Sequence, residues 1–521
     1  MTPTPSPALP AIIALARSGA LDRARRLFDE AGLRSADDAA SLSVHGRLLK
    51  DEARRAGPDE RPRLWREAGD AYARAAALGG DTYPLINAAT LALLAGDRPT
   101  AEARAGEVLA RLQAGDTGPE TPYYLEATRA EALLLLGRTE EAAASLRAAC
   151  ALAPEAWEDH ASTLRQFSLI LETLDEDAGW LAPLQPPRSL HFAGHMGVDD
   201  DPALRAAIDE RLAAERIGFA FGALAGGADL IVAEAVLARG AELHLVLPAS
   251  PPVFRAESAA PLGGDWSGRF DAVLDRAASV AVAGSGRDAT TMLHIRLAAE
   301  IAMGRAVMKA AGLASEAVQL LIADPGADGS ATEHIGAHWR AAGRRQLRLE
   351  QPRPGDAAPG GHRLPAAPEG GRLAALIAVG LEDDAPAQLA RAAAALDGTT
   401  PLTPAVVAAE VLHLAFADPL EAGAVAGRIA RDGTSRVAAH YGVVRLVDSP
   451  FGAPPAAIGA ATGVAPDLLA STPPGAIHVS EALAAALHSR AELGPGETAW
   501  IGELVRDGRT LGLHALTPPD A

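Results

Sequence analysis

The stretch Ile217-Gly-Phe-Ala-Phe-Gly-Ala-Leu-Ala-Gly-Gly-Ala-Asp229 decides how the middle of this chain folds. Its first six residues are apolar and indicate a buried strand, and the glycines at 226 and 227 precede a helical pattern over 230–239. An apolar strand, a glycine turn and a helix in succession are typical of a parallel sheet covered by helices on both faces. Ligands of such sheets bind beyond the carboxyl ends of the strands, where these glycines stand.

Strands and helices alternate on both sides of this stretch. The sequence predicts strands at 189–193, 242–248, 279–283 and 319–323, and helices at 202–216 and 289–310. Two more glycine turns follow strands, at Gly194 and at Gly284-Ser-Gly286. We therefore predict a Rossmann-like α/β domain with a parallel sheet over residues 183–349.

Three glycine turns at the same end of one sheet indicate a pocket for a nucleotide or a sugar phosphate. Glycine lets the backbone approach a ligand closely, and the N–H groups at the start of a helix favour anions. The predicted ligand contacts are Gly194, His195, Gly226, Gly227, Asp229, Ser285 and Arg287. The alternative is that the glycines only form tight turns, that His195 is a hydrogen-bonded histidine at a strand end, and that the helix dipole stabilises Asp229.

Together with Glu242-Leu-His-Leu-Val-Leu-Pro248, these turns resemble the SLOG superfamily, the fold shared by sensor domains and the cytokinin-activating LOG enzymes. The LOG enzymes carry a Pro-Gly-Gly-x-Gly-Thr-x-x-Glu loop whose Glu, with an Arg, serves hydrolysis of a nucleoside monophosphate. The corresponding turn here, Gly284-Ser-Gly-Arg-Asp-Ala-Thr-Thr291, has no Glu at the matching place. The resemblance therefore implies binding of a nucleotide or an NAD-derived ligand without hydrolysis.

Residues 8–180 show helical periodicity only. Pairs of amphipathic segments recur at 11–32, from Tyr83 and from Tyr124, and Gly96-Asp97 and Gly137-Arg138 separate the halves of the last two pairs. Helical hairpins of this kind stack into a solenoid, because one hairpin cannot bury its apolar face alone. We predict an all-α helical-repeat solenoid over residues 1–182.

This pattern resembles tetratricopeptide repeats. The block Thr82-Tyr-Pro-Leu-Ile-Asn-Ala-Ala-Thr-Leu-Ala-Leu-Leu-Ala-Gly-Asp97 looks like the divergent, TRAF-binding-like repeats found beside nucleotide-sensor domains. The resemblance implies a surface that binds protein partners or forms oligomers. The alternative is a solenoid that only packs against the next domain.

The Pro- and Gly-rich residues 350–372 predict a linker, and residues 373–518 mix strands with helices. Strands are predicted at 376–379, 411–416, 435–439 with 442–446, 476–479 and 510–515, and helices at 386–396, 419–431, 454–469 and 480–489. The blocks at 435–445, 455–463 and 473–481 are similar to class III adenylate and guanylate cyclases. This resemblance implies an α+β, ferredoxin-like cyclase homology domain.

Cyclisation of a nucleoside triphosphate needs two metal ions held by two carboxylates. The first predicted strand has no Asp near Ile377, although residues 382–384 are acidic. The second carboxylate falls at Glu410, where Val411 replaces a glycine and disfavours the tight turn. The family's transition-state Asn and Arg fall at Ile458 and Thr462.

We therefore predict a catalytically degenerate cyclase-like domain that is retained for homodimerisation. The alternative is an active cyclase that uses Glu410 as a catalytic residue with the acidic cluster at 382–384, and Mg²⁺ or Mn²⁺ as its cofactor.

No other metal site is predicted. The run Asp199-Asp200-Asp201 reads as a helix N-cap cluster, and His334 and His338 share a helix face without an evident third ligand. We expect that face to be solvated.

The composition narrows the class of protein. Among 521 residues, 47 are basic and 66 acidic, and the net charge of −19 argues against a protein that coats nucleic acid. The single cysteine excludes an internal disulfide, and no apolar run of about 18 residues predicts a membrane span. The N-terminus has no secretory signal pattern, so we expect a cytoplasmic protein.

The predicted function is intracellular signalling, with a helical scaffold coupled to a nucleotide sensor and a degenerate cyclase-like domain. The alternatives are an active adenylate or guanylate cyclase and a non-catalytic interaction scaffold.

Overall fold

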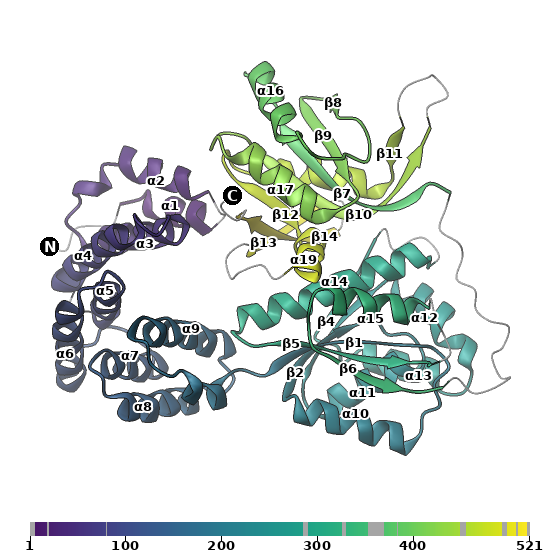
Figure 1. Ribbon diagram of the computed structural model, residues 1–521, viewed down its shortest axis with the longest axis horizontal. Helices are drawn as coiled ribbons and strands as arrows, with labels where there is room; N and C mark the ends of the chain where they lie inside the picture. The colour runs from purple at the N-terminus through teal and green to yellow at the C-terminus, as the bar shows by residue number, and fades with distance from the viewer. Residues whose placement is uncertain are drawn as a thin grey trace. The chain divides into compact units, whose positions relative to one another are not determined.

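The computed structural model describes residues 6–17, 20–79, 81–284, 290–325, 330–352, 369–382, 384–448, 455–491, 498–506 and 509–517. The chain divides into two compact units, with the boundary between Pro186 and Pro187 (Figure 1). The first unit is helical, and the second contains a parallel sheet and a mixed sheet.

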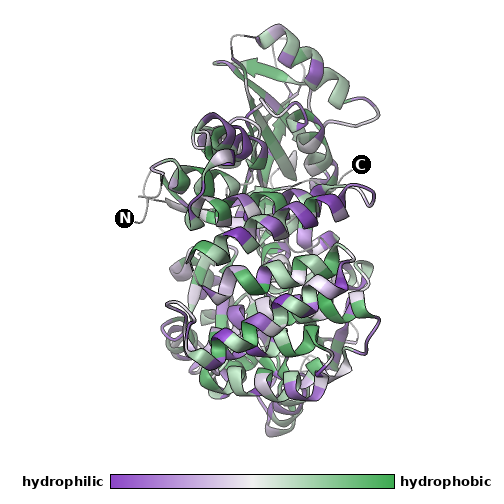
Figure 2. Cartoon of the chain, turned by 90° about the vertical axis from the view of Figure 1, so that its left-hand side faces the viewer, coloured by the Kyte–Doolittle hydropathy of each residue, from purple (hydrophilic) through white to green (hydrophobic). Residues whose placement is uncertain are grey.

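The first unit is built from successive helices joined by short turns, and Figure 2 shows that these helices carry both hydrophobic and hydrophilic residues. Its described α-helices are α1 Leu9–Arg17, α2 Leu21–Glu30, α3 Ala39–Arg55, α4 Arg61–Gly79, α5 Thr82–Leu94, α6 Arg98–Ala114, α7 Pro122–Leu135, α8 Thr139–Leu152 and α9 Trp157–Leu174. Antiparallel pairs such as α3 with α4 and α7 with α8 make the most extensive contacts. The predicted helical hairpins at 11–32, from Tyr83 and from Tyr124 are therefore present.

Small residues explain how the hairpins close. Gly96 and Gly137 adopt φ of +82° and +71° at the turns within two hairpins, a conformation that favours glycine. Asp97 then caps α6 by accepting a hydrogen bond from the Thr100 N–H. A β-carbon at Gly46 of α3 would lie 2.8 Å from the ring of Tyr72 in α4, so these two helices approach closely.

The parallel sheet of the second unit has the strand order β4-β3-β2-β1-β5-β6 among the described residues. Its strands are β1 Arg188–Gly194, β2 Ile217–Gly222, β3 Glu242–Leu247, β4 Ser279–Val282, β5 Ala317–Ala323 and β6 Gln346–Glu350. Every neighbouring pair runs parallel. The order reverses between β1 and β5, which gives the sheet one topological switch point.

Helices cover both faces of this sheet, as the apolar strands require. They are α10 Pro202–Ala214, α11 Ala228–Ala238, α12 Pro251–Ser258, α13 Trp266–Leu274, α14 Met292–Gly312 and α15 Ala331–Ala341. Leu190 and Phe192 of β1 belong to a core shared with α10, α11, α12 and α13. On the other face, Met303 of α14 and Trp339 of α15 pack against Ala193.

The mixed sheet has the order β13-β14-β12-β10-β7-β9-β8, with β11 paired to β10. Its described strands are β7 Gly371–Gly380, β8 Val406–Ala408, β9 Val411–Phe416, β10 Val437–Val447, β11 Ala456–Ile458, β12 Ile477–Ser480, β13 Thr498–Arg506 and β14 Arg509–Leu516. Its helices are α16 Ala385–Ala395, α17 Pro419–Ala430, α18 Val464–Leu469 and α19 Glu481–Arg490. Leu468 of α18 packs on one face against Ala378 and Ala438, and α17 and α19 lie on the other.

The predicted helix at 454–469 is wrong over its first half. Residues 456–458 form the short strand β11, antiparallel to the end of β10, and the α-helix begins only at Val464. The hydrogen bonds offered by the edge of β10 decide this conformation over the helical propensity of the alanines.

In the part of the chain that the structure describes, no helix is long and apolar enough to cross a membrane.

Candidate functional site

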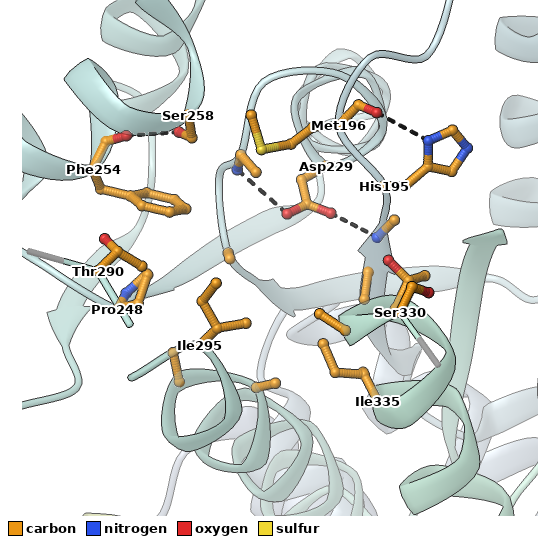
Figure 3. Close-up of a pocket in the computed structure, with 18 of the residues that line it drawn as sticks. His195, Met196, Asp229, Pro248, Phe254, Ser258, Thr290, Ile295, Ser330 and Ile335 are labelled. Atoms are coloured by element: carbon orange, nitrogen blue, oxygen red, sulfur yellow. Dashed lines mark hydrogen bonds between the residues drawn. The ribbon is translucent and has the colours of Figure 1, made fainter. Parts of the chain in front are cut away.

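A cavity of about 390 Å³ lies at the carboxyl end of the parallel sheet (Figure 3). The segments after β1, β2 and β3 contribute to its wall, as do α12 and the N-terminal turns of α14 and α15. It borders the switch point between β1 and β5, where open α/β sheets bind their ligands. Three predicted contacts, Gly194, His195 and Asp229, line this cavity.

Asp229 is a buried carboxylate in the first turn of α11. Its Oδ1 accepts the backbone N–H of Gly194 at 2.8 Å, and its Oδ2 accepts that of Ala225 at 3.3 Å (Figure 3). Burial raises the pKa of Asp229 to about 7, and the two backbone hydrogen bonds act in the opposite direction. The side chain thus ties the end of β1 to the loop after β2.

The predicted glycines are packed against protein atoms. A β-carbon at Gly194 would lie 2.3 Å from the Ala228 side chain, and one at Gly226 would lie 2.7 Å from the Ser258 carbonyl oxygen. Gly227 has φ of +96° and packs against the backbone of His195. Gly226 and Gly227 are not among the residues that line the cavity. These contacts account for all three glycines by close packing of strand, turn and helix.

His195 is held by the main chain on both sides of its ring. Its Nδ1 lies 3.0 Å from the Met196 carbonyl oxygen, and its Nε2 lies 2.8 Å from that of Gln351. Figure 3 shows the ring beside the Met196 carbonyl, at the edge of the group of cavity side chains. This geometry fits the alternative of a hydrogen-bonded histidine at a strand end.

The polar residue Thr290, just before α14, lines the cavity and was not among the contacts predicted from the sequence. Thr290 is fully buried, and its backbone N–H donates to Glu257 Oε2 at 3.0 Å. Thr290 lines the cavity, and its buried hydroxyl has no hydrogen-bond partner among the described residues. A buried hydroxyl without a partner is costly, so a ligand that reached it would gain a hydrogen bond.

The N-terminus of α15 reaches the same cavity. Ser330 caps this helix by accepting the Glu333 N–H at 3.2 Å, and Thr332 and Ile335 line the wall. The remaining first-turn N–H groups of α14 and α15 have no carbonyl partner within their helices and favour negative charge. The motif Ser330-Ala-Thr-Glu333 could have indicated this helix start from the sequence.

The rest of the wall is largely apolar and carries no Arg or Lys among the described lining residues. Phe254, Ile295 and Ile335 provide a surface suited to a ring system. The predicted contacts Ser285 and Arg287 lie outside the described residues.

The cyclase-like segment has a second set of candidate residues. The strand β7 contains no acidic residue, and Glu410 is exposed in the turn between β8 and β9. A tight turn forms there with Ala409 and Glu410 at positive φ, of 49° and 61°, a conformation that costs free energy for residues other than glycine.

Within the acidic cluster at 382–384, Asp384 is exposed and lies 3.8 Å from Arg391. Glu382 is paired with Arg436 at 3.0 Å, and Asp383 lies outside the described residues. Ile458 is on β11, and the Thr462 hydroxyl donates to the Gly459 carbonyl at 2.8 Å.

Within the described residues, no group of three or more His, Cys, Asp or Glu side chains could hold a metal ion. Asp201 caps α10 by accepting the Leu204 N–H, as the predicted N-cap cluster requires. His334 is exposed, but His338 is half-buried and contacts the Ser489 hydroxyl at 3.2 Å. The face that these two histidines share is therefore only partly solvated.

Comparisons with known proteins place tetratricopeptide-type repeats in the first unit. The family described as Tetratricopeptide Repeats-Sensor matches residues 10–92, and no curated protein matches the chain.

Among solved structures, the adenylyl cyclase CyaB from P. aeruginosa is 10% identical, with 28% of this chain and 95% of that chain covered and a TM-score of 0.24. The guanylate cyclase domain of RhGC from Catenaria anguillulae, in complex with GTP, is 10% identical, with 29% and 98% covered and a TM-score of 0.25. The adenylate/guanylate cyclase/hydrolase from Silicibacter pomeroyi is 18% identical, with 29% and 99% covered and a TM-score of 0.24. These TM-scores lie below 0.5, so the cyclase interpretation continues to rest on the sequence blocks.

Proposed function

We propose that this chain is a signalling protein that senses a small nucleotide or NAD-derived ligand in the cavity of its parallel sheet. One observation carries the proposal: Thr290, just before α14, lines that cavity, and its buried hydroxyl lacks a partner among the described residues. A ligand phosphate or ribose hydroxyl would satisfy this group, and the helix N-termini would favour the phosphate charge.

The apolar part of the wall supports the same class of ligand. Phe254, Ile295 and Ile335 offer van der Waals contact to a nucleobase, and a volume of about 390 Å³ suits a small organic molecule. The cavity thus combines an apolar surface for a ring with polar groups for its substituents.

Titration calorimetry of the full chain with ADP-ribose, NAD, nucleoside monophosphates and cyclic nucleotides tests the proposal. We expect at least one of these to bind, and Thr290→Val to weaken its binding about fivefold to tenfold, the equivalent of one hydrogen bond. The control is Thr173→Val, which changes an exposed threonine of α9 in the first unit. Absence of binding by all these compounds, or unchanged affinity in Thr290→Val, would overturn the assignment and favour the interaction scaffold.

We propose further that the mixed-sheet domain does not cyclise nucleotides and joins two copies of the chain. Its edge strands β8 and β13 carry exposed apolar side chains, with Val407 at 52% and Trp500 at 54% exposure. Analytical ultracentrifugation of the full chain should give a dimer, and Val407→Arg and Trp500→Arg should shift it towards monomer. A monomeric wild type would contradict this assignment.

The helical unit is proposed to bind a protein partner. Tyr83 and Tyr124 stand exposed on the first turns of α5 and α7, two successive hairpins, and are the side chains that we expect a partner to contact. A partner that binds the wild type and Tyr83→Ala/Tyr124→Ala equally well would contradict this placement.

A further inference from the structure

Two helices that line the cavity also contact the mixed-sheet domain. Ile295, Ala298 and Ala299 of α14 face the cavity, and the next residue, Glu300, contacts the mixed-sheet domain. Figure 1 shows α19 beside α14, and this pair makes the most extensive contact between the two sheet domains.

Glu300 is a buried carboxylate whose hydrogen bonds come from the other domain. Its side chain is only 4% exposed, and its Oε2 accepts the Tyr441 hydroxyl and Arg490 Nη2, each at 2.8 Å. Arg490 also donates to the Tyr441 hydroxyl at 3.1 Å. One residue of α14 is therefore fixed to both β10 and α19.

The helices α14 and α19 are packed directly against each other. A β-carbon at Gly304 of α14 would lie 2.0 Å from the Ala485 carbonyl oxygen of α19, so the two backbones are in direct contact. The next residue of α14, Arg305, pairs with Glu481 of α19 at 2.8 Å. Close-packed groups of this kind transmit a displacement rather than absorb it.

The second helix makes an equivalent connection. Ile335 of α15 lines the cavity, and His338, three residues later, contacts Ser489 of α19. Arg344, which follows α15, donates to the carbonyl oxygens of His488, Ser489 and Ala491 at 2.6, 2.9 and 3.0 Å. The C-terminus of α19 is thus capped by the parallel-sheet domain.

We propose that occupancy of the cavity is coupled to the local stability of α19, through α14 with its Glu300–Arg490–Tyr441 cluster and through α15. A ligand group that displaces Ala299 also displaces Glu300, which is bonded to Tyr441 and Arg490. A group that displaces Ile335 likewise moves α15, whose His338 contacts Ser489 of α19. Because coupling between two sites is reciprocal, a change at this cluster must also alter the cavity. The ligand's identity rests on the proposed function, whereas the coupling itself does not.

Hydrogen exchange of the full chain tests the coupling without a ligand. Ala299→Leu fills part of the cavity, and we expect it to change amide exchange in residues 481–490 at least fivefold. The control is Gly312→Ala at the C-terminal end of α14, where an added β-carbon meets nothing within 4 Å. This variant should leave amide exchange in α19 unchanged. Addition of ADP-ribose, NAD or AMP should alter the same amides if one of them binds.

The reciprocal experiment uses Tyr441→Phe, which removes one hydrogen bond to Glu300. It should alter exchange in residues 292–299 at least fivefold, even if Ala299→Leu does not fold. Unchanged α19 exchange in Ala299→Leu, or unchanged exchange at 292–299 in Tyr441→Phe, would overturn the coupling. If the variants respond but no nucleotide binds, the coupling stands and the ligand assignment falls. If a nucleotide binds but exchange is unchanged in both variants, the ligand assignment stands and the coupling is overturned.

Discussion

The carboxylate of Asp229 accepts the backbone N–H of Gly194, so the first turn of α11 holds the end of β1 from 35 residues away. The same carboxylate accepts the N–H of Ala225 from the loop after β2. Both segments form part of the cavity wall. The side chain predicted to contact a ligand therefore also shapes the site.

Asp229 should make stability depend on pH. Its folded pKa of about 7 lies above the ordinary value of 3.8, so between these values the native state retains a proton that the unfolded state has lost. The stabilisation that Asp229 provides is complete below pH 3.8. Above that value it decreases as pH rises through 7, and the free energy of unfolding falls by up to about 1.4 kcal/mol per pH unit. The urea concentration at the midpoint of unfolding should fall between pH 4.5 and pH 7.5, and it should fall less for Asp229→Asn than for the wild type. Parallel falls in the two proteins would contradict this.

Gly194→Ala should destabilise the second unit by about 1 to 3 kcal/mol, because the added methyl group meets the Ala228 side chain. The matched control is Gly268→Ala in α13, where a β-carbon meets nothing within 4 Å. That substitution should be neutral or stabilising by up to about 1 kcal/mol, since alanine favours a helix. Thermal unfolding of both variants checks the difference, and equal melting temperatures would refute it.

Gly304→Ala should separate α14 from α19 and cost about 1 to 3 kcal/mol, because its β-carbon would overlap the Ala485 carbonyl. Gly312→Ala lies in the same helix with open space around its β-carbon. We expect chemical denaturation to show a loss of stability for the first variant only. A Gly304→Ala protein as stable as wild type would show that the two helices can move apart freely.

Incubation of the full chain with ATP or GTP and Mn²⁺ should yield no cyclic nucleotide. The reason is that β7 offers no carboxylate, while Glu382 is engaged by Arg436. Chromatography of the reaction products measures the outcome. Cyclic product that disappears in Glu410→Ala would establish the active-cyclase alternative instead.

Two strands could be predicted from the sequence to the residue, the apolar Ile217–Gly222 and the largely apolar Val411–Phe416. The prediction failed where tertiary contacts decide the conformation. The strand β11 has three residues and forms because the edge of β10 is available. The edge strand β13 has exposed and half-buried residues over 498–505 and no buried one among them. Neither segment carries a local signal strong enough to outweigh its alternatives.

The position of the cavity was predictable, but much of its wall was not. Parallel sheets place their ligand sites at the carboxyl edge, and Gly194, His195 and Asp229 do lie there. Thr290 and Ser330 reach the cavity only because the order of the strands brings α14 and α15 together. Glycine turns predict a backbone that approaches a ligand closely, but Gly194, Gly226 and Gly227 are needed for close packing of strand and helix.

The burial of Glu300 also determines how the chain can be divided. Its charge is compensated by Arg490, 190 residues later and beyond the Pro- and Gly-rich residues 350–372. A cut in that stretch would leave one fragment with an uncompensated carboxylate on α14 and the other with a bare arginine on α19. The two sheets therefore belong in one expressed fragment, and the compact unit of residues 187–519 contains both charges.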